Sequence, residues 1–289
     1  MASSQTSTPL SSEELADRLR PRTIAEILDG AFGLYRNTFG RVVAGQAIML
    51  APLAPLTLLS PLVSQLLLPL FYTLTQALCY REGMDTLLAR RIGLGASLGR
   101  AVRDWPVLLF AALLYFVGVV VVAFAAAIPA LGVALIAGLA TLAPVAAVAA
   151  VGAAGMAGVA TVAGATYLGL YAPIALFESR WMPLRRSIEL VRGAFWKVIL
   201  TIILVGILVG IPQGVLQLAI WLEDGMRSNL FKIPPQAWHL IGSSAIAVLT
   251  VPLSVYVTIL LWVDRCATRD GTDLAPRPAD DAIARIEPI

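Results

Sequence analysis

The chain has 289 residues, of which 58% are hydrophobic and only 13% are charged, and its formal net charge is +3. Soluble domains are about half apolar and about a quarter charged, so this composition excludes an ordinary soluble domain. A small net charge without a long basic block also argues against a nucleic-acid-binding protein. The only cysteines, Cys79 and Cys266, fit neither a disulfide framework nor a metal-binding motif.

Long segments without any Asp, Glu, Lys or Arg dominate the chain: residues 42–80, 105–177, 198–222 and 233–263. A run of about 18 apolar residues is enough to suggest a membrane-spanning helix. The sequence therefore predicts an all-α, polytopic integral membrane protein with a single membrane domain over residues 21–263.

The N-terminal region is polar before it becomes amphipathic. Residues 1–20 are rich in Ser and Thr and are predicted to be mobile. Thr23 and Glu26 then form the sequence pattern of a capping box, and apolar residues follow at helical spacing. We expect an amphipathic helix over residues 23–38, which either lies in the membrane interface or packs on the cytoplasmic ends of the bundle.

About six membrane-spanning helices follow from the segment lengths and the positive-inside rule. The loops 81–104 and 178–197 each carry five Lys or Arg residues, which predicts that both are cytoplasmic. An even number of membrane crossings must then lie between the two loops. The segment 105–177 is therefore assigned two full spans, and the residues left between them, 129–153, are predicted to be re-entrant or laterally packed. The predicted spans are residues 42–60, 65–88, 105–127, 154–177, 195–222 and 239–263.

The same spans predict the orientation of the chain. Only Arg227 and Lys232 of the 21 cationic residues fall outside the cytoplasmic segments. All 6 tryptophans fall at predicted span ends, where amphipathic indoles favour the headgroup region. Both termini and the tail 264–289 are therefore expected in the cytoplasm. The use of Arg in place of Lys, together with many Ala residues, suggests the cytoplasmic membrane of a bacterium.

Residues 177–197, FESRWMPLRRSIELVRGAFWK, form a short basic interruption between two uncharged segments. Pro183 suits the first turn of a helix that separates apolar from charged residues. We interpret it as an interfacial helix that contacts anionic lipid headgroups or a partner, each cation contributing about 1 kcal/mol near the surface. The candidate contacts are Arg185, Arg186, Arg192 and Lys197. The alternative is a topology anchor without a chosen ligand.

The last two predicted spans carry small and polar residues at helical spacing. Glycines spaced by four residues allow close helix approach, and hydroxyl and amide side chains can hydrogen-bond between helices. The candidate helix-packing residues are Gly206, Gly210, Gly214, Gln213, Gln217, Thr250, Ser254 and Thr258. The alternative is a polar cavity for a substrate, but the spans lack the ionisable residues that usually mark ion coupling.

No catalytic constellation is visible in the sequence. His239 is the only histidine, at a predicted outer boundary, and there is no nucleophile–base pair, metal cluster or Gly-rich phosphate loop. The chain is therefore predicted to be non-enzymatic, with no cofactor and no metal site.

Three segments resemble a known family. They are RPRTIAEILDGAFGLYRNTFGRV (20–42), APIALFE with PLRRSIELVRGAFWKVI (172–199), and DRCATRDGTDL (264–274). Together they are similar to bacterial proteins grouped with the glycerophosphoryl diester phosphodiesterase membrane domain. The resemblance covers the membrane region alone; it implies no phosphodiesterase barrel, whose paired-histidine site a single histidine cannot supply.

These observations favour a non-enzymatic membrane protein that binds lipids or a protein partner on its cytoplasmic face, as an accessory protein or scaffold. The second hypothesis is a transporter or flippase-like protein that uses proline-broken helices around the polar faces of the last two spans. The third is a membrane-embedded lipid-modifying enzyme.

Overall fold

The computed structural model describes residues 21–53, 55–56, 60–90, 92–139, 143–178, 182–226 and 235–269. Within these ranges the regular structure is entirely helical, and no strand is present. This confirms the all-α prediction. The N-terminal segment 1–20 and the tail beyond residue 269 lie outside the described residues.

Helix α2 (Ile24–Leu50) begins at the capping box that the sequence predicts. The Thr23 hydroxyl oxygen accepts a hydrogen bond from the Glu26 amide, and the Glu26 carboxylate accepts one from the Thr23 amide at 2.7 Å. The helix continues without interruption from the predicted interfacial segment 23–38 into the start of the predicted span 42–60. The amphipathic segment and the apolar segment are therefore one element.

Helix α4 (Pro61–Leu87) follows Ser60, whose hydroxyl caps its first turn, and it is succeeded by α5 (Leu94–Leu139). With 46 residues, α5 is about 69 Å long. The hydrocarbon core of a bilayer is about 30 Å thick, so α5 is more than twice as long as one perpendicular crossing requires.

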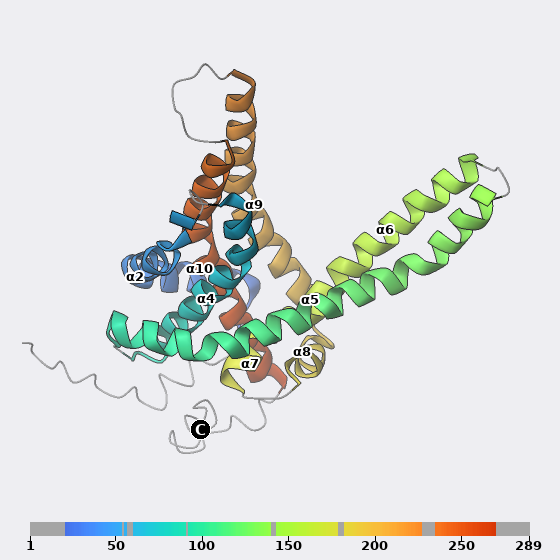
Figure 1. Cartoon of the computed structure of the whole chain (residues 1–289). Helices are drawn as coiled ribbons and strands as arrows, with labels where there is room; N and C mark the ends of the chain where they lie inside the picture. The colour runs from blue at the N-terminus through green and yellow to red at the C-terminus, as the bar shows by residue number, and fades with distance from the viewer. Residues whose placement is uncertain are drawn as a thin grey trace, which may run out of the picture.

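Helix α6 (Ala143–Leu168) runs back along α5, and the two form a long antiparallel hairpin that projects away from the other helices (Figure 1). Residues 129–153, predicted to be re-entrant or laterally packed, belong to the far ends of this hairpin, apart from the undescribed 140–142, and their position relative to a membrane stays a prediction. Pro129 lies inside α5 without ending it, although an interior proline removes a backbone donor and its ring crowds the preceding turn.

Three further helices follow α6: α7 (Tyr171–Phe177), α8 (Pro183–Val191) and α9 (Phe195–Met226). Gly193 makes the turn between α8 and α9 at φ +90°, a conformation that favours glycine. Helix α10 (Pro235–Arg269) then packs against α9 as a second hairpin (Figure 1). The start of α9 and the end of α10 consequently meet.

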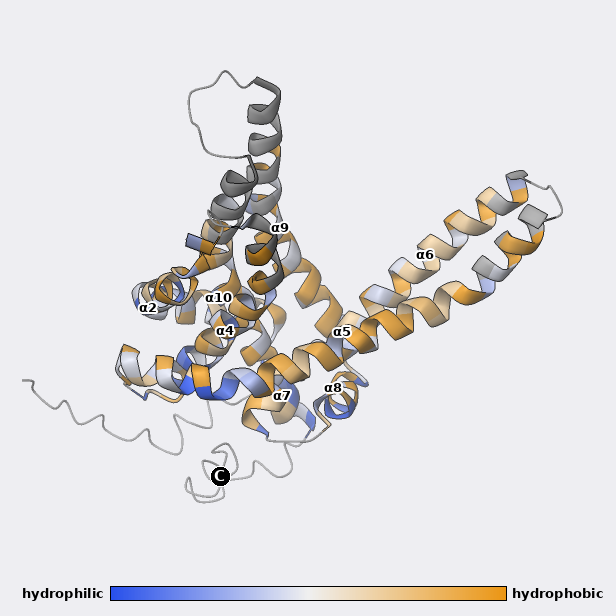
Figure 2. Ribbon diagram, in the orientation of Figure 1, coloured by the Kyte–Doolittle hydropathy of each residue, from blue (hydrophilic) through white to orange (hydrophobic). Residues whose placement is uncertain are grey.

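Helices long and apolar enough to cross a membrane are present in four places among the described residues. They are Leu94–Pro129, Ala147–Phe177, Phe195–Pro212 and Ala245–Arg269. Hydrophobic residues line most of α5 beyond its first turns, whereas hydrophilic residues gather at the start of α5 and on α8 (Figure 2). This architecture is compatible with a membrane protein, and the larger count of about six spans stays a prediction.

Helix α10 lies at the centre of the core. In its apolar segment 61% of the residues are buried, compared with 11% to 17% in the other three candidate spans. Its fully buried Tyr256 packs over Gly83 of α4, where an added Cβ would lie only 2.7 Å from the Tyr256 ring and from Ile259. The absence of a side chain at Gly83 therefore allows α4 and α10 to approach closely.

Candidate functional site

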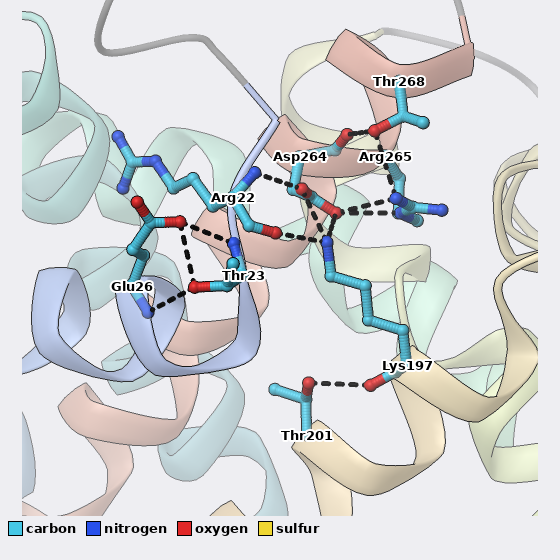
Figure 3. Close-up of polar contacts among 8 residues, drawn as sticks. All are labelled: Arg22, Thr23, Glu26, Lys197, Thr201, Asp264, Arg265 and Thr268. Carbon is cyan, nitrogen blue, oxygen red and sulfur yellow. Dashed lines mark hydrogen bonds and ion pairs between the residues drawn. The ribbon is translucent and has the colours of Figure 1, made fainter.

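The carboxylate of Asp264, near the C-terminal end of α10, joins three distant segments of the chain (Figure 3). Both of its oxygens lie 2.8 Å from the Lys197 ammonium at the start of α9. Its Oδ1 also accepts a hydrogen bond from the backbone amide of Arg22 at 2.7 Å, and its Oδ2 accepts one from Arg265 Nε at 3.0 Å. We call Arg22, Lys197, Asp264 and Arg265 the Asp264 cluster.

Lys197 makes a further contact within the Asp264 cluster. Its ammonium donates to the carbonyl oxygen of Arg22, directly before α2 begins. The Arg22 amide is bound by Asp264 and the Arg22 carbonyl by Lys197, so the backbone that enters α2 is held on both sides (Figure 3). The cluster therefore fixes where the amphipathic helix α2 joins the bundle.

A second polar cluster lies around Glu178, immediately after α7. Its carboxylate pairs with Arg186 Nε of α8 at 3.2 Å and accepts a hydrogen bond from Trp262 Nε1 of α10 at 3.0 Å. The thiol sulfur of Cys266 lies 3.8 Å from the same carboxylate. We call Glu178, Arg186, Trp262 and Cys266 the Glu178 cluster.

Burial determines what these clusters can do. Taking charges out of water is costly, so a buried ion pair contributes little net stability, but removing one partner leaves an uncompensated charge. Asp264 is fully buried and Glu178 is largely covered. The two carboxylates therefore connect α2, α7, α8, α9 and α10 through specific ion pairs and hydrogen bonds.

The structure separates the four predicted lipid contacts into two pairs. Arg186 and Lys197 have side chains only 13% and 24% exposed, and they belong to the Glu178 and Asp264 clusters. Arg185 is 79% exposed, with Glu189 at 3.3 Å as a partner one turn away, and Arg192 is also exposed. Only Arg185 and Arg192 therefore present their charge outward.

Large apolar side chains share this exposed surface. Met182, Ile188 and Trp196 are exposed large hydrophobic residues on α8 and at the start of α9. Cationic and indole side chains placed beside exposed apolar side chains are typical of a membrane interface. We call Met182, Arg185, Ile188, Arg192 and Trp196 the α8 surface.

Thr258 of α10 has a side-chain hydrogen bond with Tyr80 of α4, whereas the predicted packing glycines of α9 contact no other helix among the described residues. A Cβ added at Gly206, Gly210 or Gly214 would find no other atom within 4 Å. The hydroxyl groups on α10 donate to carbonyl oxygens of their own helix: Thr250 to Ile246, Ser254 to Val251 and Thr258 to Ser254. The side chains of Gln213 and Gln217 lie outside the described part of the chain. The packing role of these residues stays a prediction.

Two buried carboxylates on α4, Glu82 and Asp85, received no role in the sequence interpretation, although the predicted span 65–88 includes both. Glu82 lies 3.6 Å from Arg41 of α2, and Asp85 lies 2.6 Å from Arg100 of α5. Their spacing of three residues places both on one side of α4. The helical spacing of Glu82 and Asp85 was the signal in the sequence that could have indicated these two carboxylates.

Among the described residues, no group of three or more His, Cys, Asp or Glu side chains is placed to hold a metal ion. Comparisons of the chain with protein-family models, with curated proteins and with solved structures found no match. The resemblance to the glycerophosphoryl diester phosphodiesterase membrane domain therefore stays a prediction. Its three segments do contact one another, since residue 22, residue 197 and residue 264 meet in the Asp264 cluster.

Proposed function

We propose that this chain is a non-enzymatic, six-span protein of the bacterial cytoplasmic membrane that binds anionic lipid headgroups through the α8 surface. The observation that carries the proposal is the outward presentation of Arg185 and Arg192 beside the exposed Trp196. Basic residues at a membrane surface attract anionic headgroups, and the indole ring favours the same depth.

The orientation is supported by the two hairpins. Because α6 returns along α5 and α10 returns along α9, the basic segments 81–104 and 178–197 and the end of α10 come to one end of the bundle (Figure 1). The positive-inside rule favours the cytoplasm for that end. The N-terminal residues before α2 reach the same place through the Asp264 cluster, which supports an inside location for both termini.

The experiment is lipid retention by the purified full chain, measured by native mass spectrometry in mild detergent with phosphatidylglycerol and phosphatidylcholine. The variant carries Arg185→Gln and Arg192→Gln. Each arginine near the surface contributes about 1 kcal/mol, so the pair is expected to lower phosphatidylglycerol affinity by about 30-fold with little change for phosphatidylcholine.

A matched control removes the same charge elsewhere. Arg227→Gln with Lys232→Gln deletes two cations that are predicted to lie on the outer side of the membrane. This control is expected to retain phosphatidylglycerol as the wild type does. If the Arg185/Arg192 variant retained phosphatidylglycerol as well as the wild type does, lipid binding by the α8 surface would be refuted. Helix α8 would then be a topology anchor only.

A further inference from the structure

Four buried polar atoms on α2, α4 and α5 have no hydrogen-bond partner among the described residues. They are Gln46 Oε1, Glu82 Oε1, Thr86 Oγ1 and Ser97 Oγ. Leaving such an atom unsatisfied in a protein interior is unfavourable, and native structures contain few of them. Their concentration on adjoining helices indicates a common ligand.

Contacts between the helices bring these groups together. The Gln46 amide nitrogen of α2 donates to the Cys79 sulfur of α4 at 3.2 Å. Cys79 lies one turn before Glu82, and Thr86 lies one turn after it, so these side chains share a side of α4. Gln46 therefore faces the same stretch of α4 as Glu82 does.

Arg41 connects this stretch of α4 to the start of α5. Its guanidinium lies 3.6 Å from the Glu82 carboxylate and 3.4 Å from the carbonyl oxygen of Ile92. Ser97 follows in the first turn of α5 and is fully buried. The unsatisfied oxygen atoms thus lie in the region that α2, α4 and the start of α5 enclose.

The charges in this region favour a cation. The side chains of Glu82 and Asp85 are only 2% and 8% exposed, whereas those of their partners Arg41 and Arg100 are 41% and 34% exposed. Water therefore screens the positive charges more than the negative ones, and the interior is left with an excess of negative potential.

The oxygen atoms also indicate the size and charge of the ligand. Calcium takes six to eight oxygen ligands and magnesium retains several waters. Here one oxygen of a single carboxylate is accompanied by one amide oxygen and two hydroxyl oxygens. This set suits a monovalent cation better than a divalent one.

We propose that Glu82 is the centre of an internal binding site for one small monovalent metal cation such as sodium, with neutral oxygen ligands from Gln46, Thr86 and Ser97. The ionisable groups around it are Arg41 on α2, Cys79 and Asp85 on α4, Arg100 on α5 and Tyr256 on α10. This site is separate from the α8 surface, so it does not depend on lipid binding.

Modification by dicyclohexylcarbodiimide tests the site, because this apolar reagent reacts with protonated carboxyl groups in apolar surroundings. The purified full chain is treated at one fixed, mildly acidic pH in choline buffer with and without sodium chloride, and modification of each carboxyl group is measured by peptide mass spectrometry. Sodium is expected to lower the modification of Glu82 at least 10-fold. Glu178 and Asp264, which lie outside the proposed site, provide internal controls in the same sample.

Choline chloride at the same concentration controls for ionic strength. Protection of Glu82 by sodium but not by choline supports the site. Equal modification of Glu82 in sodium and in choline would overturn the proposal and leave only ordered water at these atoms.

Ser97→Ala removes one neutral ligand with a small change of volume. It is expected to raise the half-protecting sodium concentration several-fold. Thr166→Ala is the matched control, because it removes a buried hydroxyl that already bonds to Val162 of its own helix. An equal shift in both variants would contradict a role for Ser97 in binding.

Discussion

The Lys197 ammonium lies 2.8 Å from both carboxylate oxygens of Asp264, a residue 67 positions further along the chain. Because Asp264 also accepts a hydrogen bond from the Arg22 amide, one carboxylate connects the beginning of α2, the beginning of α9 and the end of α10. The second hairpin and the amphipathic helix are therefore fixed to each other at a single buried position.

Asp264→Ala should destabilise the fold by about 3–5 kcal/mol, because the largely covered Lys197 and Arg265 would lose their counter-charge. Thermal unfolding in detergent, followed by circular dichroism, measures the loss. Glu189→Ala is the control, since it removes a partly exposed partner of Arg185, with only a 4.0 Å contact to Arg186, and should cost no more than about 1 kcal/mol. A similar loss for both variants would show that the Asp264 cluster is not a stabilising joint.

Replacing both partners should be less harmful than replacing one. The double variant Lys197→Met and Asp264→Leu removes both charges and fills their space with apolar atoms, which commonly leaves stability near that of the wild type. Its unfolding midpoint in the same assay should lie above that of Asp264→Ala. A midpoint below that of the single variant would indicate that the hydrogen bond from the Arg22 amide dominates.

Gly83→Ala should destabilise the protein by about 1–3 kcal/mol, because the added methyl group overlaps the Tyr256 ring and Ile259. Gly210→Ala on α9 is the matched control. Its Cβ would meet no atom within 4 Å, so the better helix propensity of alanine should make it neutral or slightly stabilising. Loss of stability on Gly210→Ala alone would instead support the predicted packing role of the α9 glycines.

The hydroxyl groups of Thr38 and Tyr256 should be energetically coupled. They lie 2.7 Å apart in the core, and since Thr38 donates to the Leu34 carbonyl oxygen at 2.8 Å, Tyr256 donates to Thr38. A double-mutant cycle with Thr38→Val and Tyr256→Phe should give a coupling free energy of about 1 kcal/mol. Additive effects would show that the hydrogen bond contributes nothing measurable.

The native cysteines test the orientation. Neither Cys79 nor Cys266 should react with a membrane-impermeant maleimide in intact cells. After permeabilisation the partly exposed Cys266 should react, whereas the buried Cys79 should react only after unfolding. Cys266→Ser identifies the labelled site. Labelling of Cys266 from outside would contradict a cytoplasmic location for the end of α10.

Much of the helical architecture could be predicted from the chain alone, because its causes are local. Uncharged segments longer than about 18 residues predict membrane helices whatever they pack against. The capping box at Thr23 depends only on Glu26, three residues away, and the structure contains it. The path of residues 129–153 could not be obtained this way, because the choice between a re-entrant segment and one long hairpin depends on contacts between α5 and α6.

The roles of individual charged residues required the tertiary structure. Arg185 and Arg186 are adjacent and chemically identical, yet one points to solvent and the other pairs with Glu178. Glu82 falls inside the predicted span 65–88, but its burial and its pairing with Arg41 depend on the distant helix α2. Hydropathy and periodicity therefore determine which segments become apolar helices, whereas the burial of a given charge depends on partners supplied by distant helices.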